Sequence, residues 1–206
     1  MYEEQYVYIV DDDDDLRESL VDLIATRTRW RVRPFIDGRS WLDAEQHASP
    51  GCVLLDHSMP GMTGLAVLQE MQKRQSMHQI VMLTGEGNIA IAVDAMRTGA
   101  TDFVEKPARF EQLEHSIGAA MDRLNNVVET GKRSGEARAK IARLKPRERD
   151  VMLGLVEGHP NKIIAYRLGL SIRTVELYRA ALMDRLEVDS VADVLKLAFA
   201  AHMINA

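Results

Sequence analysis

Short apolar runs alternate with amphipathic segments along the first 124 residues of the chain. The runs, rich in Val, Ile and Leu, lie at residues 6–10, 32–36, 53–55, 80–83 and 103–104. Segments with apolar residues at helical spacing lie at residues 16–24, 39–46, 65–74, 89–97 and 110–124. Strands that alternate with helices of this length predict βαβ units and a parallel sheet whose middle strands are buried on both faces. We therefore expect a (βα)5 α/β domain over residues 1–124.

The strand signal disappears after residue 124. Residues 125–140 contain two glycines and no clear apolar stripe, so we interpret them as a linker. Helical patterns follow at residues 146–157, 161–168, 173–186 and 191–201, and Asp189-Ser190 is expected to cap the last helix. The pattern predicts a second, all-α domain of four helices over residues 141–206.

Side chains that can bind a cation or a phosphoryl group follow four of the expected strands. Asp11 and Asp12 follow the first strand, Asp56 the third, Thr84 the fourth and Lys106 the fifth. In a parallel sheet these carboxyl ends lie at one edge, where ligands bind. Three carboxylates there would repel one another unless a hard divalent cation, Mg²⁺ or Mn²⁺, lay between them. An ammonium and a hydroxyl opposite the metal would complete a phosphoryl-binding site.

Each of these groups also has a less specialised interpretation. The acidic run can be a solvated turn, Asp56 an ordinary strand-end carboxylate and Lys106 a surface amine. We favour a shared site because four separate strand ends supply complementary groups. Later in the acidic run, Asp14 or Asp15 is expected to cap the first helix, where negative charge suits the helix dipole.

The motifs of the first half resemble those of a two-component receiver domain. They are Val-Asp-Asp at 10–12, Leu-Leu-Asp-x-x-Met-Pro-Gly-Met-Thr-Gly at 54–64, Thr-Gly at 84–85 and Glu-Lys-Pro at 105–107. The resemblance implies a phosphoryl-acceptor site. The residues that it assigns are Asp56 as the acceptor, Asp11, Asp12, Asp56 and the Ser58 main-chain carbonyl as metal ligands, and Thr84 and Lys106 as ligands of phosphoryl oxygens.

The resemblance also implies a switch and a phosphoryl donor. Phe103 would turn inward when Thr84 moves toward the phosphoryl group, although plain core packing is the alternative for this aromatic. Ser58 and Glu86 would tune the lifetime of the acyl phosphate, and the peptide bond before Pro107 would be cis. The donor would be a histidine of another protein, a sensor histidine kinase. His57 is adjacent to Asp56 but is not the expected donor, because neighbouring residues on a strand point to opposite faces.

The helical half contains the parts of a helix-turn-helix, namely a support helix, a short turn with Gly169 and a second helix. A generic four-helix regulatory bundle is the alternative. The residues that the pattern exposes on the first turns of the second helix are Arg173, Thr174, Glu176, Leu177, Arg179 and Ala180.

Motifs in this half resemble the LuxR-type output domain. They are Leu-x-Pro-Arg-Glu at 144–148, Gly-x-x-Asn-Lys at 158–162, Ser-x-Arg-Thr-Val-Glu at 171–176 and Arg-x-x-Leu-Met-x-Arg-Leu at 179–186. With the receiver, the chain is similar to response regulators of the FixJ and NarL type, and closest to the FixJ branch. The resemblance implies binding of double-stranded DNA, through Asn161, Lys162, Arg173, Thr174 and Arg179 on phosphates and Glu176, Leu177 and Ala180 on base edges.

Charge agrees with this division. The chain has a formal net charge of −5. Residues 1–124 have 21 acids and 12 bases, a net of −9, whereas residues 125–206 have 10 acids and 14 bases, a net of +4. An excess of basic residues favours a nucleic-acid partner for the second half.

Other patterns exclude classes of protein. A single cysteine, Cys52, excludes a disulfide framework, and the longest uncharged stretch, residues 57–69, is too short to span a bilayer. The acidic N-terminus predicts no signal peptide, so we expect a cytoplasmic protein without membrane contact. No P-loop motif occurs, which argues against an NTPase. A phosphatase of the haloacid-dehalogenase type would have a second acid two residues after its nucleophile, where this chain has Ser58.

The sequence therefore predicts a response regulator and not an enzyme. Phosphorylation would change the surface of residues 91–103, then release the output domain or form a homodimer that binds DNA. The expected partners are a sensor histidine kinase, double-stranded DNA, a second copy of the chain and RNA polymerase. The resemblance implies transcriptional control, usually activation. A regulator that binds protein or RNA instead of DNA is the remaining alternative.

Overall fold

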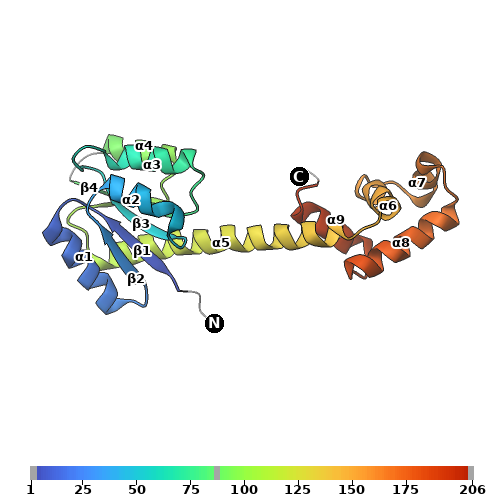
Figure 1. The fold of residues 1–206 in the computed structure, drawn as a ribbon, viewed down its shortest axis with the longest axis horizontal. Coiled ribbons are helices and arrows are strands. Elements are labelled where there is room, and N and C mark those ends of the chain that lie inside the picture. The colour runs from blue at the N-terminus through green and yellow to red at the C-terminus, as the bar shows by residue number, and fades with distance from the viewer. Residues whose placement is uncertain (1–3, 86–88, 204–206) are drawn as a thin grey trace. The chain divides into compact units, whose positions relative to one another are not determined.

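The computed structural model describes residues 4–85 and 89–203, and the chain forms two compact units, Met1–Asn126 and Val127–Ala206. Figure 1 shows both units, and each is considered by itself below. No helix within the described ranges is both long enough and apolar enough to cross a membrane.

The first unit is the expected (βα)5 domain. Its strands are β1 (Tyr6–Val10), β2 (Arg31–Phe35), β3 (Gly51–Asp56), β4 (Gln79–Thr84) and β5 (Asp102–Glu105). They pair in parallel in the order β2-β1-β3-β4-β5. The helices are α1 (Asp14–Arg27), α2 (Gly38–Ala44), η1, a short 3-10 helix (Glu45–His47), α3 (Gly64–Lys73), α4 (Ile89–Thr98) and the first part of α5 (Phe110–Ala142), whose residues after Asn126 belong to the second unit.

Alternate residues of the strands fill two separate apolar clusters. Tyr8, Val53 and Met82 pack with the side chains of α2, α3 and α4 on one face of the sheet. Ile9 and Leu54 pack with α1 and α5 on the other face, together with Cys52. Burial raises the pKa of the Cys52 thiol, which is therefore an unreactive part of this core. Figure 1 shows α1 and α5 on one side of the sheet and α3 and α4 on the other.

The start of α1 corrects one sequence expectation. Asp13, and not Asp14 or Asp15, is the N-cap, and its carboxylate accepts a hydrogen bond from the main-chain N–H of Leu16 at 3.1 Å. Asp14 and Asp15 lie in the first turn of the helix. Their charge still interacts favourably with the helix N-terminus, but an acid in that turn has helical backbone angles and does not act as the cap.

The second unit is helical, as expected. Its helices are α6 (Pro146–Val156), α7 (Asn161–Leu168), α8 (Ile172–Leu186) and α9 (Val191–Ala200). Their core includes Met152, Val175 and Leu182, and Ser190 caps α9 as predicted. The residues expected to form a linker, 125–140, lie within α5, and the domain limits at 124 and 141 stay predictions.

A buried carboxylate ties together two helices of this unit's core. Glu148 on α6 is 3% exposed, accepts the main-chain N–H of Lys145 at 2.8 Å and pairs with Arg185 of α8 at 2.8 Å. Burial alone would raise the pKa of Glu148, but these two partners outweigh it and hold that pKa below its ordinary value. The ion pair thereby fixes the start of α6 against α8, the second helix of the helix-turn-helix.

Gly64, the first residue of α3, allows this helix to approach the end of β3. A Cβ atom at this position would lie 2.2 Å from the main-chain carbonyl oxygen of Asp56. The Gly64 N–H donates to the carbonyl of His57 at 2.9 Å, so the helix cannot move away without losing a hydrogen bond. Only glycine therefore fits beside the residue that ends β3.

We expect Gly64→Ala to lower the free energy of unfolding of the first unit by about 1–3 kcal/mol, because the added methyl group collides with backbone. Gly118→Ala is the matched control, since its Cβ would meet no atom within 4 Å in helix α5. That change should raise stability by about 0.5–1 kcal/mol. Urea unfolding followed by circular dichroism measures both values, and equal stabilities for the two variants would contradict the collision.

Candidate functional site

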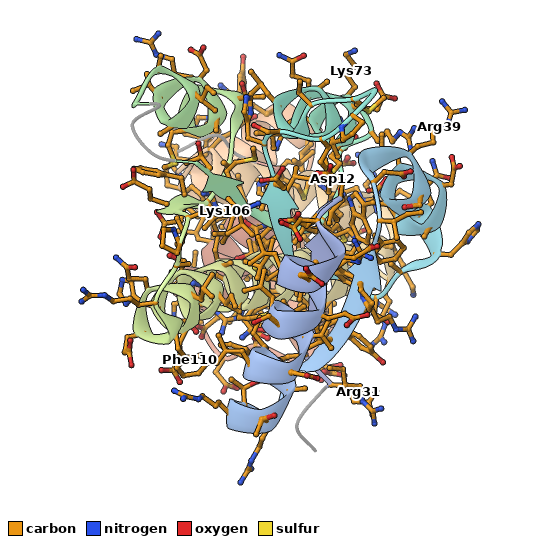
Figure 2. The ribbon with its side chains drawn as sticks, turned by 90° about the vertical axis from the view of Figure 1, so that its left-hand side faces the viewer. Asp12, Arg31, Arg39, Lys73, Lys106 and Phe110 are labelled. Carbon is orange, nitrogen blue, oxygen red and sulfur yellow. The ribbon has the colours of Figure 1, made fainter. Side chains whose placement is uncertain are left out.

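The sheet brings together the ends of four strands at one edge. Asp11 follows β1, Asp56 ends β3, Thr84 ends β4 and Lys106 follows β5, and these strands are consecutive neighbours in the sheet. The pairing of neighbouring strands places their carboxyl ends side by side, with Asp56 of β3 paired with Leu83 of β4. In the view of Figure 2, Asp12 and Lys106 lie toward the middle, whereas Arg31, Arg39 and Lys73 lie at the margin.

Three carboxylates meet at this edge, as the sequence predicts. Asp11, Asp12 and Asp56 each offer an oxygen atom, and these atoms lie within 4.8 Å of one another. Asp11 is 0% and Asp56 4% exposed, while Asp12 is open to solvent. Main-chain N–H groups anchor the two buried carboxylates, because that of Asp13 donates to Asp11 at 3.0 Å and that of Ser58 to Asp56 at 2.8 Å.

Lys106 lies between the two buried carboxylates. Its ammonium is 2.7 Å from Asp11 Oδ2 and 2.5 Å from Asp56 Oδ1. Burial by itself lowers the pKa of Lys106, but the hydrogen bonds and charges of both carboxylates outweigh it and raise that pKa above its ordinary value. The amine is therefore a permanent cation at this edge. The peptide bond between Lys106 and Pro107 is cis, as the resemblance implies.

The oxygen atoms present suit a hard divalent cation. Carboxylates are the ligands that Mg²⁺ and Mn²⁺ prefer, and one exposed carboxylate leaves room for water and phosphate oxygens. One ammonium cannot neutralise three carboxylates, so the cluster keeps a net negative charge that a cation would offset. The Ser58 carbonyl as a further ligand stays a prediction.

The two residues expected to form a switch differ in their surroundings. Thr84 is 5% exposed, and its hydroxyl donates to the carbonyl of Gly85 at 3.3 Å, a long bond that leaves the hydroxyl free to find another acceptor. Phe103 is 44% exposed on β5, so simple core packing does not explain this aromatic. Glu86, predicted to tune the acyl phosphate, lies outside the described residues.

Sequence reasoning missed a buried cation next to this site. Arg17 is 8% exposed, and its Nη1 donates to the main-chain carbonyl of Asp11 at 2.8 Å. A signal for it exists in the sequence, because Arg17 shares the buried face of α1 with Leu20 and Ile24 at spacings of three and seven residues. A charged residue on an otherwise apolar helix face requires a buried partner.

The second candidate site is the exposed face of the helix-turn-helix. Gly169 ends α7 in the left-handed conformation, and the Ser171 hydroxyl accepts the N–H of Thr174 at the start of α8. Glu176 and Ala180 are exposed on α8, and Leu177 is 65% exposed.

The residues expected to contact phosphates lie around this face. Lys162 and Arg173 are exposed, while Thr174 is half-buried. Asn161 and Arg179 contact each other, because Arg179 Nη1 donates to the Asn161 side-chain oxygen at 2.6 Å. The structure thus brings the basic groups of α7 and α8 to one region of the second unit.

Comparison with known proteins agrees with this division. Residues 7–118 match the response regulator receiver domain, and residues 142–198 match the luxR family of bacterial regulatory proteins. The transcriptional regulatory protein FixJ of Bradyrhizobium diazoefficiens is 37% identical over 97% of both chains.

Solved structures give the same result. A crystal structure of full-length FixJ from B. japonicum, 37% identical, covers 98% of both chains with a TM-score of 0.61. The response regulator StyR, 28% identical, covers 96% of this chain and 99% of its own with a TM-score of 0.81. The chain therefore belongs to the family of response regulators that carry a LuxR-type output domain after their receiver domain.

Proposed function

We propose that this protein accepts a phosphoryl group on Asp56 from a sensor histidine kinase and then binds promoter DNA to regulate transcription. The observation that carries the proposal is the position of Asp56 at a strand end, between Lys106 at 2.5 Å and the carboxylates of Asp11 and Asp12. Family membership supports both the phosphoryl transfer and the DNA binding, because one domain matches receiver domains and the other matches the luxR family.

Asp56 has the properties of a phosphoryl acceptor. The Ser58 N–H donates to Asp56 Oδ2 at 2.8 Å, and the Lys106 ammonium lies 2.5 Å from Oδ1. Oδ1 would attack phosphorus as the Lys106 ammonium turns to a phosphoryl oxygen. Attack on a phosphohistidine forms the P–O bond of an acyl phosphate and breaks the P–N bond, and the histidine nitrogen leaves with the electron pair. Mg²⁺, held by Asp11, Asp12, Asp56 and the Ser58 carbonyl, would neutralise charge on the phosphoryl oxygens.

Lys106 and Thr84 would receive the transferred group. Before transfer, the Lys106 ammonium pairs with Asp11 and Asp56, and afterwards it can pair with a phosphoryl oxygen at the same place. The weakly engaged Thr84 hydroxyl can donate to a second oxygen. Its movement would make room for Phe103 to turn inward, which changes the surface of residues 91–103.

The proposed output is binding of double-stranded DNA. Helix α8 would lie in the major groove, with Glu176, Leu177 and Ala180 on base edges, while basic groups of α7 and α8 contact phosphates. A phosphorylation-driven homodimer would pair two such helices on a two-fold site, in the cytoplasm and within reach of RNA polymerase. Because its relatives are transcriptional regulators, we propose a regulator and not an enzyme. Turnover of small phosphate esters would contradict this.

We expect Asp56→Asn to abolish incorporation of a phosphoryl group from acetyl phosphate, measured by intact-protein mass, because the amide is a poor nucleophile. Phosphate-stimulated DNA binding in a gel shift should disappear with it. Asp15→Asn is the matched control, since this exposed acid of α1 contributes no oxygen to the cluster. DNA affinity that acetyl phosphate leaves unchanged in the parent protein would refute control by phosphorylation.

We expect Lys162→Ala to weaken binding to a mixed-sequence duplex and to reduce the slope of log affinity against log salt by about one, because one phosphate contact is lost. Fluorescence anisotropy between 50 and 200 mM salt, roughly the range over which such contacts are screened, measures the slope. Arg167→Ala is the control, because Arg167 is on the same helix but pairs with Glu157 at 2.9 Å. Equal slopes for the two variants would remove Lys162 from the interface.

A further inference from the structure

Arg17 is a buried cation that the phosphoryl-transfer chemistry does not use directly. In residues 4–85 and 89–203, no other arginine or lysine is as deeply buried. It lies on the face of α1 that packs against the sheet, with Leu20 and Ile24. Removing a guanidinium from water is unfavourable unless its donors are satisfied, and an apolar side chain would fill this position without that penalty.

Arg17 contacts the main chain that follows β1 and the first residue of its own helix. Nη1 donates to the main-chain carbonyl of Asp11 at 2.8 Å, and Nη2 pairs with the carboxylate of Asp14. These two partners flank Asp12 and Asp13 in the chain. The guanidinium therefore ties the main chain of Asp11, where the segment with two carboxylates of the cluster begins, to the start of α1.

The same segment has other contacts as well. The Asp13 carboxylate accepts the Leu16 N–H at 3.1 Å, and the Lys106 ammonium lies 2.7 Å from Asp11 Oδ2. The N–H of Asp11 donates to the carbonyl of Phe35 at 3.2 Å, and the N–H of Asp13 donates to the Asp11 carboxylate at 3.0 Å. The second of these bonds lies inside the segment and cannot fix its position on the sheet. Arg17 adds a side-chain bond from the buried face of α1 to the Asp11 main-chain carbonyl, and this face is anchored by its apolar residues.

We infer that Arg17 is a positioning residue for the metal site, which acts by holding the Asp11–Asp12 backbone in place. The inference rests on the proposed function, because it takes Asp11 and Asp12 as metal ligands. Arg17 contacts the main chain and not the carboxylate oxygens that would bind the cation, so it orients ligands without being one. Removing such an outer partner typically weakens metal affinity by about 10–100-fold.

The test is calorimetric titration of the full chain with MgCl₂ alone. Arg17→Met keeps the unbranched stem and removes every donor, so the Mg²⁺ dissociation constant should rise by about tenfold or more. Arg17→Lys keeps the charge and one donor group and should recover part of the affinity. If Arg17→Met does not fold, Arg17→Gln takes its place with the same expected loss, because its neutral side chain is too short to hold both partners.

Leu20→Ala separates positioning from stability. Leu20 is buried on the same helix face, and truncating it destabilises the unit without altering a contact to the Asp11 segment. We expect its Mg²⁺ affinity to fall by much less than the about tenfold loss expected for Arg17→Met, because Leu20 donates no hydrogen bond to the Asp11 segment. Comparable losses of affinity in Leu20→Ala and Arg17→Met would overturn the inference, and so would parent-like affinity in Arg17→Met. Absence of Mg²⁺ binding by the parent protein would instead refute the proposed metal site, and the inference with it.

Discussion

Two carboxylates that are almost completely removed from water share one small volume with an ammonium group. Asp11 and Asp56 would repel each other strongly in this place, and the Lys106 ammonium makes the arrangement tolerable by contacting both. Such a cluster contributes little to stability, because desolvation offsets most of the attraction. The sheet and its two apolar faces must therefore hold the charged groups together. The strand order places the ends of four neighbouring strands at one edge, and Gly64 lets α3 pack closely against Asp56.

The two units have net charges of opposite sign. The first gathers carboxylates at a sheet edge, where a cation and a phosphoryl group are proposed to bind. The second has an excess of basic residues, with Lys162 and Arg173 exposed near α8, where a polyanion is proposed to bind. Each unit has its own apolar core, so the charged groups of each unit are held in place by that unit's own packing. The chain-wide charge of −5 conceals this division.

Much of the fold could be predicted from the sequence because its signals are local. Runs such as residues 6–10 and 80–83 indicated strands, and parallel pairing then required their carboxyl ends, with Asp11, Asp56 and Lys106, to meet. Other features depend on partners distant in the sequence. The role of Arg17 depends on the main-chain carbonyl of Asp11, and the hydrogen bond from Arg179 to Asn161 joins two helices. The N-cap of α1 was predicted at the wrong residue because residues 11–15 are all aspartates, and each of them has a side chain that can cap a helix.

The hydrogen bond between Arg179 and Asn161 bears on the thermodynamics of binding. A free arginine has many rotamers, and freezing one on complex formation costs about 0.5–1.5 kcal/mol in conformational entropy. Here the 2.6 Å bond from Arg179 Nη1 restricts the guanidinium while the protein is still unbound. That entropy is lost on folding, so a partner that accepts the remaining donors meets a side chain already oriented for it. A preorganised cation of this kind favours slow dissociation over a higher rate of encounter.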